Sequence, residues 1–397
     1  MTRPVVVVPD ITEVAQLAKP AKDVEVTVVS SGIEKDRFVR LPFELYRDDP
    51  FWVPPLIMER HEFLDPAHNP FFRHAEVALF LARREGKVVG RIAAIEDRNY
   101  NAFQGCKVAY FGLFESIDDP GVAAALVAAA RNWGRWRGLH QIIGPMSLST
   151  NQECGLLVEG FDSSPSVMMA YNPPYYAELL ESCGFRKAKD LYAFERSARV
   201  PAPERFVRVA DKIRAHEGIT VRPLDVANFE AEVARIKTVY NSAWEKNWGF
   251  VPMTDAEFDK LAKDLKQLVV PELALIAEAH GEPIAFSLTV PDINQAFKKV
   301  GGRLTTFGLP IGLAKLLWFQ KRITKVRLMA LGIKEGWRRR GLDAVLIVET
   351  IRRTDQAGYE GGEVSWTLED NTLINRAIEA SGARRSKVYR LYEMPVE

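Results

Sequence analysis

Cysteine and histidine are scarce in this chain. Its 397 residues include 3 cysteines and 6 histidines. Cys106, Cys154 and Cys183 are odd in number and lack CxxC spacing, which argues against a disulfide framework. The histidines likewise lack the spacing of a metal site. We therefore expect buried thiols in a reducing compartment and chemistry that uses no metal.

The chain also lacks an excess of either charge and any long apolar run. Lys plus Arg number 53 and Asp plus Glu 52, which leaves a net charge of +1. This balance gives no bulk attraction to nucleic acid, so no nucleic-acid partner is expected. No run reaches the roughly 20 apolar residues of a spanning helix, and the apolar start is too short for a signal peptide. We expect a cytoplasmic protein, with any membrane contact peripheral and from the inner face.

The length and the apolar content predict two domains. The chain has 397 residues, of which 47% are hydrophobic, enough to build two cores. We predict an N-terminal lead-in over residues 1–30 and a first domain over 31–200. A Pro-Ala-Pro sequence then begins a linker helix over 201–218, and the second domain covers 219–397.

An internal repeat supports this division. Residues 76–97 read as two alternating strands joined by a short polar turn, and residues 272–292 repeat that pattern. Residues 184–195 and 382–393 share Gly, Arg, Lys and Glu at identical spacing. The chain is therefore predicted to contain two copies of one unit of mixed α/β structure.

The stretch from Gly332 to Gly341 is the best candidate for a binding site. It follows a strand-like run at residues 326–331 and precedes a helix-like run at 342–357. A Gly- and Arg-rich turn at a helix N-terminus presents backbone N–H groups and guanidinium groups to an anion. The turn has neither the P-loop nor the dinucleotide-fold signature, and we expect it to bind a pyrophosphate.

Arg338-x-x-Gly341-x-Asp343 resembles the loop with which GNAT acyltransferases hold the pyrophosphate of acyl-coenzyme A. Asp343 departs from that pattern, which has a small residue there. The order of strands and helices resembles the GNAT fold in both halves, over roughly residues 35 to 397. The resemblance implies two tandem GNAT-like domains with a mixed sheet, and acyl-coenzyme A as cosubstrate. The cofactor-binding residues that it implies are Leu331, Gly332, Ile333, Arg338, Arg339, Arg340, Gly341 and Asn371.

Three further segments are similar to a narrower group of tandem GNAT proteins. They are residues 244–250, 291–294 and 365–371. Bacterial members of that group acylate long-chain amines, including the sphingoid bases that become ceramides. The resemblance implies an amine acceptor of this kind.

The two copies differ at the phosphate position. The loop over residues 114–121 has no arginine and carries Glu115, Asp118 and Asp119. These acids would repel a pyrophosphate, so we expect the first copy to bind no coenzyme A and to supply walls on the acceptor side.

The catalytic residues are less clearly marked. GNAT enzymes use an acidic base, for which we rank Asp292 first, Glu363 second and Glu245 third. Their usual tyrosine acid corresponds to Ile378, so Tyr389 and Tyr392 on the following strand are the substitutes, of which Tyr389 is the candidate.

An apolar segment interrupts the second copy over residues 304–322 and ends in Trp318 and cations. It fits either a peripheral membrane contact beside a lipid pocket or a buried connecting helix. Taken together, these features predict an acyl-coenzyme A-dependent N-acyltransferase with a hydrophobic acceptor or a long acyl chain. Two alternatives remain, a Fem-type transferase that uses aminoacyl-tRNA and a non-catalytic GNAT-fold ligand-binding protein.

Overall fold

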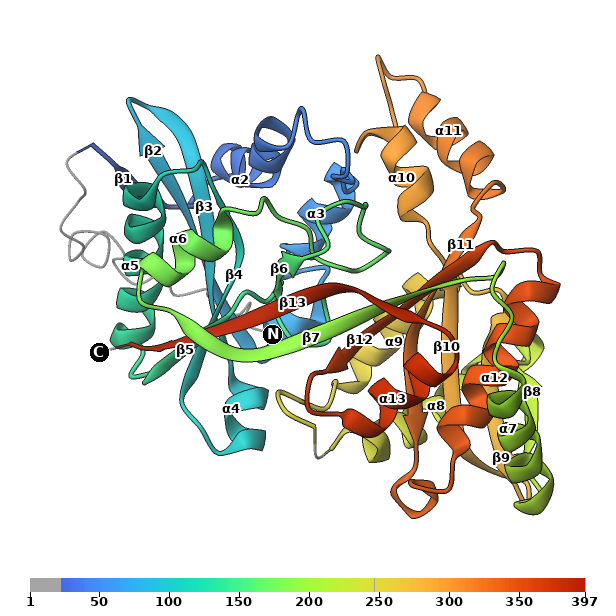
Figure 1. Cartoon of the computed structure of the whole chain (residues 1–397). Coiled ribbons are helices and arrows are strands. Elements are labelled where there is room, and N and C mark those ends of the chain that lie inside the picture. Colours follow the sequence, from blue (N-terminus) through green and yellow to red (C-terminus); the bar gives the residue numbers. More distant parts are fainter. Residues whose placement is uncertain (1–22, 246, 397) are drawn as a thin grey trace, which may run out of the picture.

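The computed structural model describes residues 23–245 and 247–396, so most of the lead-in expected over residues 1–30 lies outside the described part. Strands from the whole described chain form one mixed sheet of 13 strands. In Figure 1 the two halves lie side by side, and two long strands cross from one to the other.

The first half begins with a short edge strand and ends with one of the crossing strands. In chain order it contains β1 (Glu25–Val28), α2 (Gly32–Leu45), α3 (Ile57–Phe63), β2 (Ala75–Arg84), β3 (Lys87–Asp97), α4 (Arg98–Gln104), β4 (Val108–Ser116), α5 (Pro120–Trp136), β5 (Gln141–Gly144), β6 (Leu156–Glu159), α6 (Tyr176–Ser182) and β7 (Arg186–Ser197).

A connecting helix, α7 (Glu204–His216), leads into the second half. That half contains β8 (Thr220–Pro223), α8 (Phe229–Trp244), α9 (Asp255–Leu265), β9 (Ala274–Ala279), β10 (Glu282–Pro291), α10 (Asn294–Val300), α11 (Ile311–Gln320), β11 (Lys325–Ile333), α12 (Leu342–Gln356), β12 (Gly361–Leu368), α13 (Thr372–Ala380) and β13 (Arg384–Pro395).

The two hairpins predicted from alternating side chains are confirmed. β2 pairs antiparallel with β3, and β9 pairs antiparallel with β10, as the repeat in the sequence requires. The alternation works because successive side chains of a strand point to opposite faces of the sheet.

The last strand of each half lies in the sheet of the other half. The order is β1-β2-β3-β4-β5-β13-β7-β12-β11-β10-β9-β8, so β13 lies beside β5 and β7 lies beside β12. Tyr392 is opposite Gly144 in one pairing, and Ser197 is opposite Gly361 in the other. The halves therefore share their sheet, although the sequence repeats as two separate units.

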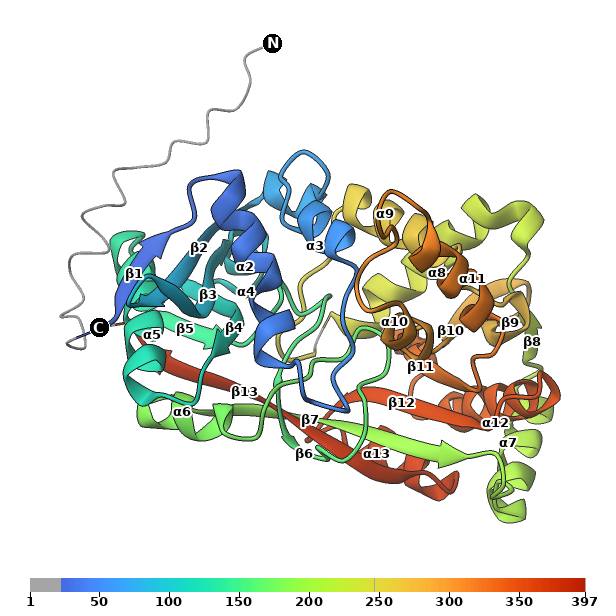
Figure 2. The ribbon, with the colours of Figure 1, turned by 90° about the horizontal axis from the view of Figure 1, so that it is seen from above.

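Helices cover both faces of the sheet in the second half. Figure 2 shows α8 and α9 on one face and α7, α12 and α13 on the other. One apolar cluster joins α7, α12 and strands β9 and β10, and another joins α12, α13 and β7. These helices therefore hold β11 and β12 from both sides. No helix in the described part of the chain is long and apolar enough to cross a membrane.

Candidate functional site

A cavity of about 300 Å³ lies in the second half, between α8, α9 and the sheet. Its walls are mainly apolar, and Arg327 is the only charged side chain among the described residues that line it. Residues 150–152 and Met168 contribute a wall from the first half. The aromatic lining residues are Phe229, Tyr240, Trp244, Trp248, Phe250, Phe258, Phe286 and Trp366.

The cavity follows an opening between two parallel strands. β11 and β12 are paired only from Lys325–Gly361 to Leu328–Val364, after which they separate. The cavity touches β11 from Arg327 to Leu331, β12 from Val364 to Leu368, and also Ile378 of α13 on the opposite face from α8. It therefore passes through the sheet, and the facing edges of both strands offer unpaired backbone groups to a ligand.

A bulge marks the start of this opening. Leu288 of β10 pairs with Ala330 and Thr289 pairs with Leu328, so Met329 has no partner in the register. Sequence reasoning missed Met329, because a bulge leaves no signal in the alternation of side chains.

Three of the predicted cofactor-binding residues, Leu331, Gly332 and Ile333, lie just beyond the bulge. Leu331 lines the cavity, while Gly332 and Ile333 are further along β11, opposite Phe286 and Ala285. Gly332 lies under an indole ring, since a Cβ there would be 2.7 Å from Trp244. Its small size lets α8 pack closely against the strand.

Three polar residues form a buried chain at one end of the cavity. Arg327 donates from Nε to Ser365 Oγ over 3.0 Å, and Ser365 Oγ donates to Glu363. Arg327 and Ser365 line the cavity, whereas Glu363 is buried behind them. A hydroxyl thus links the cavity to a carboxylate.

Asp292 and Tyr389 lie in the same buried cluster. Val167 donates its backbone N–H to Asp292 Oδ1 over 2.8 Å. Burial, reinforced by the charge of Glu363, raises the pKa of Asp292 to about 6. Burial also raises the pKa of Tyr389 well above its usual value, and its hydroxyl has no hydrogen-bond partner in the described structure. Neither residue is among those that line the cavity.

The other predicted base lies apart from this cluster. Glu245 is exposed at the C-terminal end of α8 and does not line the cavity, although the adjacent Trp244 does. Asn371 borders the cavity at the start of α13, but its side chain caps no amide of that helix. Asn375 instead binds the end of β12, accepting from Thr367 and donating to the Leu368 carbonyl over 3.0 Å.

The Gly- and Arg-rich turn leads into α12 as predicted. Gly341 is the N-cap, with φ of 80°, and no side chain caps the helix. A Cβ at Gly341 would lie 2.4 Å from Ile213, so only glycine fits both the conformation and the space. Gly341 therefore places no side chain over the start of α12, where backbone amides can bind an anion.

The three arginines of the turn have different surroundings. Arg338 donates to the backbone carbonyls of Ser242 and Ala243, over 2.7 and 2.8 Å, so it fastens the turn to α8. Arg339 is exposed, and Arg340 is exposed but pairs with Glu217. Burial raises the pKa of Asp343, and contacts of its carboxylate with the backbone of Ala344 and of Asp343 itself oppose that rise.

The corresponding helix of the first half is closed to an anion. Asp119 caps α5, accepting from the amides of Gly121 and Val122 over 2.8 and 3.1 Å, and it also pairs with Arg84. A protein carboxylate thus occupies the position that a phosphate would take. Asp118 is exposed.

The opening between the parallel strands of the first half is also filled. Met146 donates its backbone N–H to the Phe111 carbonyl over 2.8 Å. A Cβ at Gly112 would lie 1.6 Å from the Met146 carbonyl oxygen, so the chain passes directly against β4. Glu115, expected to repel phosphate, is instead buried and accepts from Tyr46 and Tyr176. The expectation that Glu115 repels a phosphate from the loop is therefore wrong, because its carboxylate lies inside the protein.

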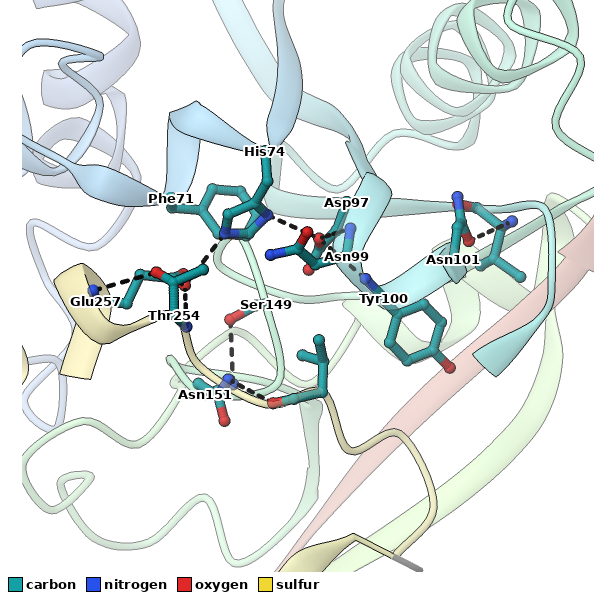
Figure 3. A network of polar contacts seen from close by, with 12 residues as sticks. Phe71, His74, Asp97, Asn99, Tyr100, Asn101, Ser149, Asn151, Thr254 and Glu257 are labelled. Carbon is teal, nitrogen blue, oxygen red and sulfur yellow. Dashed lines mark hydrogen bonds and ion pairs between the residues drawn. The ribbon is translucent and has the colours of Figure 1, made fainter. Parts of the chain in front are cut away.

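A polar network joins the halves beside the cavity (Figure 3). His74 lies between two carboxylates, with Nδ1 3.0 Å from Asp97 and Nε2 3.2 Å from Glu257 of α9. Burial lowers the pKa of His74, but the hydrogen bonds to both carboxylates raise it overall to about 9. His74 is therefore a cationic link between the halves, with Nδ1 hydrogen-bonded to Asp97 and Nε2 facing Glu257 as an ion pair.

Comparison with known proteins identifies the family. No family model matches the chain. The bacterial ceramide synthase of Caulobacter vibrioides is 38% identical over 378 residues, which cover 94% of this chain and 97% of that protein. The chain belongs to the bacterial ceramide synthase family. As a member, it is an acyltransferase, and the resemblance seen in its sequence is confirmed.

A second relative is the protein YghO of Escherichia coli, which is 38% identical over 367 residues that cover 90% of this chain and 92% of that protein. Solved structures support the fold. A tandem GNAT protein from the clavulanic acid biosynthesis pathway aligns with a TM-score of 0.53 at 12% identity, covering 94% of this chain and 99% of that one. A GCN5-related N-acetyltransferase from Sphaerobacter thermophilus aligns with a TM-score of 0.50 at 12% identity, covering 95% and 97%. This family member therefore has the tandem GNAT fold.

Proposed function

We propose that the protein transfers an acyl group from acyl-coenzyme A to the nitrogen of a hydrophobic, long-chain amine of the sphingoid-base type, which yields a ceramide-like amide. The observation that carries this proposal is the apolar cavity that runs through the opening between β11 and β12. The name of the Caulobacter relative points to the same product class.

Acyl-coenzyme A fits the second half. The uncapped start of α12 would hold the pyrophosphate, with Arg339 and Arg340 as cationic partners, while Arg338 holds the turn against α8. The unpaired edge of β11 around Met329 and Leu331 would donate backbone N–H groups to the thioester carbonyl. Asn371 borders the cavity near that edge.

The reaction needs one proton acceptor near the amine. The amine nitrogen bonds to the thioester carbon, the carbon–sulfur bond breaks, and the nitrogen loses a proton. Ser365 takes that proton as its own passes to Glu363, and the proton later reaches the departing thiolate. The geometry favours Glu363 over Asp292, because only Glu363 is linked to a hydroxyl that lines the cavity.

The lining also limits the acceptor. No carboxylate is among the described residues that line the cavity, so a polycationic amine would find no counter-charge there. A neutral amine on a long apolar chain would gain about 25 cal/mol for each Å² of apolar surface removed from water. Residues 219–397 would form the catalytic domain, and residues 31–200 would supply a wall of the acceptor site through Met168 and residues 150–152.

Neither alternative function gains support from this site. The lining is mainly apolar, and Arg327 is its one charged side chain among the described residues, which suits an aminoacyl-tRNA end poorly. The Arg327–Ser365–Glu363 chain gives the cavity a route for a proton, which a non-catalytic ligand-binding protein would not need.

The test is a comparison of acceptors. With palmitoyl-coenzyme A as donor, kcat/KM should rise steeply with the length of the amine's alkyl chain. The variant Ala330→Trp, which fills the cavity, should reduce turnover of long amines more than that of short ones. Equal kcat/KM for short polar and long amines would contradict the proposed acceptor.

A further inference from the structure

Helices α10 and α11 and their connections form an arm over residues 294–325 with an exposed apolar surface. Phe307 is 99% exposed, Leu309 59%, Leu317 56% and Trp318 60%. In Figure 1 the two helices stand at the top of the second half, away from α12 and α13. The alternative in which residues 304–322 form a buried connecting helix is therefore wrong for the side of the segment that carries these four residues. Several large apolar side chains exposed on one short segment are typical of an interaction site.

The same arm is strongly cationic. No Asp or Glu occurs between Ile293 and Lys334. Lys315 and Lys321 form no ion pair with any described residue, and Arg322 stacks on the Trp318 ring, 3.8 Å from its centre. The cations of the arm are Lys298, Lys299, Arg303, Lys315, Lys321, Arg322 and Lys325.

The arm is held in place by the first half. Ile57 donates its backbone N–H to the Gly302 carbonyl over 3.0 Å, and Asn294 donates to the Pro165 carbonyl over 2.9 Å. A Cβ at Gly302 would lie 2.4 Å from the Phe43 ring. These contacts fix the arm to the first half, so the side that carries Phe307, Leu309, Leu317 and Trp318 is exposed without any rearrangement.

We propose that this arm docks the protein on an anionic lipid bilayer. Phe307, Leu309, Leu317 and Trp318 would enter the interface, and Lys315 and Lys321 would meet lipid phosphates. A second copy of the chain fits less well, because a symmetric contact would bring two cationic arms together.

Docking would place the membrane beside the cavity. Leu316 and Phe319, on the inner side of α11, belong to an apolar cluster that includes Met168, Leu288 and Met329, and these three also line the cavity. Apolar packing thus connects the inner side of α11 to the cavity wall. The docking itself depends only on the surface and stands whichever amine is the acceptor.

Sedimentation with sucrose-loaded vesicles tests the proposal. The wild type should bind vesicles of phosphatidylglycerol and phosphatidylcholine, and binding to phosphatidylcholine alone should be much weaker. Each lysine at an anionic surface strengthens binding about fivefold, so Lys315→Gln with Lys321→Gln should weaken it about 25-fold. Phe307→Ser with Leu309→Ser should weaken it about tenfold or more. Two matched controls, Leu373→Ser at an exposed apolar site and Lys212→Gln at an exposed cationic site, should bind like the wild type.

Two results would overturn the proposal. One is wild-type protein that stays in solution with anionic vesicles. The other is an arm variant that binds as the wild type does. If the wild type is instead a dimer that Phe307→Ser with Leu309→Ser makes monomeric, and it binds no vesicles, the occupant is a second copy. Acyl transfer to a water-soluble amine without vesicles should be equal in all variants, so loss of docking is separable from failure of the proposed chemistry.

Discussion

His74 provides a prediction in which the sign and the size both follow from the structure. The imidazole lies between Asp97 and Glu257, and it bridges the hairpin of the first half to α9 of the second (Figure 3). Its folded-state pKa is raised to about 9 from an ordinary 6.5. A raised pKa means that the folded state holds the proton more tightly than the unfolded state does.

This contribution to stability is fully present below pH 6.5 and is lost as the pH rises through about 9. One pKa unit corresponds to 1.36 kcal/mol, and partial exposure of the cluster screens the interaction. We therefore expect the imidazolium to contribute about 2 kcal/mol to the free energy of unfolding at low pH, which disappears above that range.

Urea unfolding of the wild type and of His74→Gln, followed from pH 6.5 to above 9, measures this contribution. The difference between the two proteins should shrink as the pH rises, while other titrating groups affect both alike. His140→Gln makes the same change at an exposed site and should show no such trend. A wild-type advantage over His74→Gln that stays constant across this range would refute the assignment of a charged His74.

Three further predictions concern the acyl-coenzyme A site. Arg339→Ala with Arg340→Ala should weaken acyl-coenzyme A binding in calorimetry, since each charge-assisted contact is worth about 1.5–3 kcal/mol, and unchanged affinity would remove these residues from the site. Asp118→Asn with Asp119→Asn should leave the affinity for acyl-coenzyme A unchanged, because Met146 fills the opening between the parallel strands of the first half. Coenzyme A bound at residues 114–121 in a structure of the complex would contradict this prediction. Glu363→Gln should lower kcat by about 10²–10⁴-fold with little change in acyl-coenzyme A affinity, and more than Asp292→Asn does; the reverse order of kcat values would make Asp292 the base.

The fold could be predicted from the sequence where the signal is local. The hairpins follow from alternating side chains, and the turn before α12 follows from glycine and arginine at a helix start. The exchange of β7 and β13 could not be predicted. Residues 184–195 and 382–393 are very similar in sequence. Nothing local therefore decides that β7 pairs with β12 and β13 with β5, when each could pair within its own half.

The site was only partly predictable for the same reason. Asp292 and Glu363 could be selected from the sequence as candidate bases, and the structure brings them to one cluster. The chain from Arg327 through Ser365 depends on the register between β11 and β12, which are separated in the sequence by the whole of α12. Whether α11 is buried or exposed depends on what packs against it, and an apolar sequence alone does not say which.

The most direct test of the central claim is a product measurement. Wild-type protein is incubated with palmitoyl-coenzyme A and a sphingoid base, thiol release is followed, and the product is analysed by mass spectrometry. The account predicts stoichiometric release of coenzyme A thiol and an N-acyl amide, both abolished in Glu363→Gln with Ser365→Ala. Full amide formation by that double variant, or thiol release without any amide in the wild type, would contradict it.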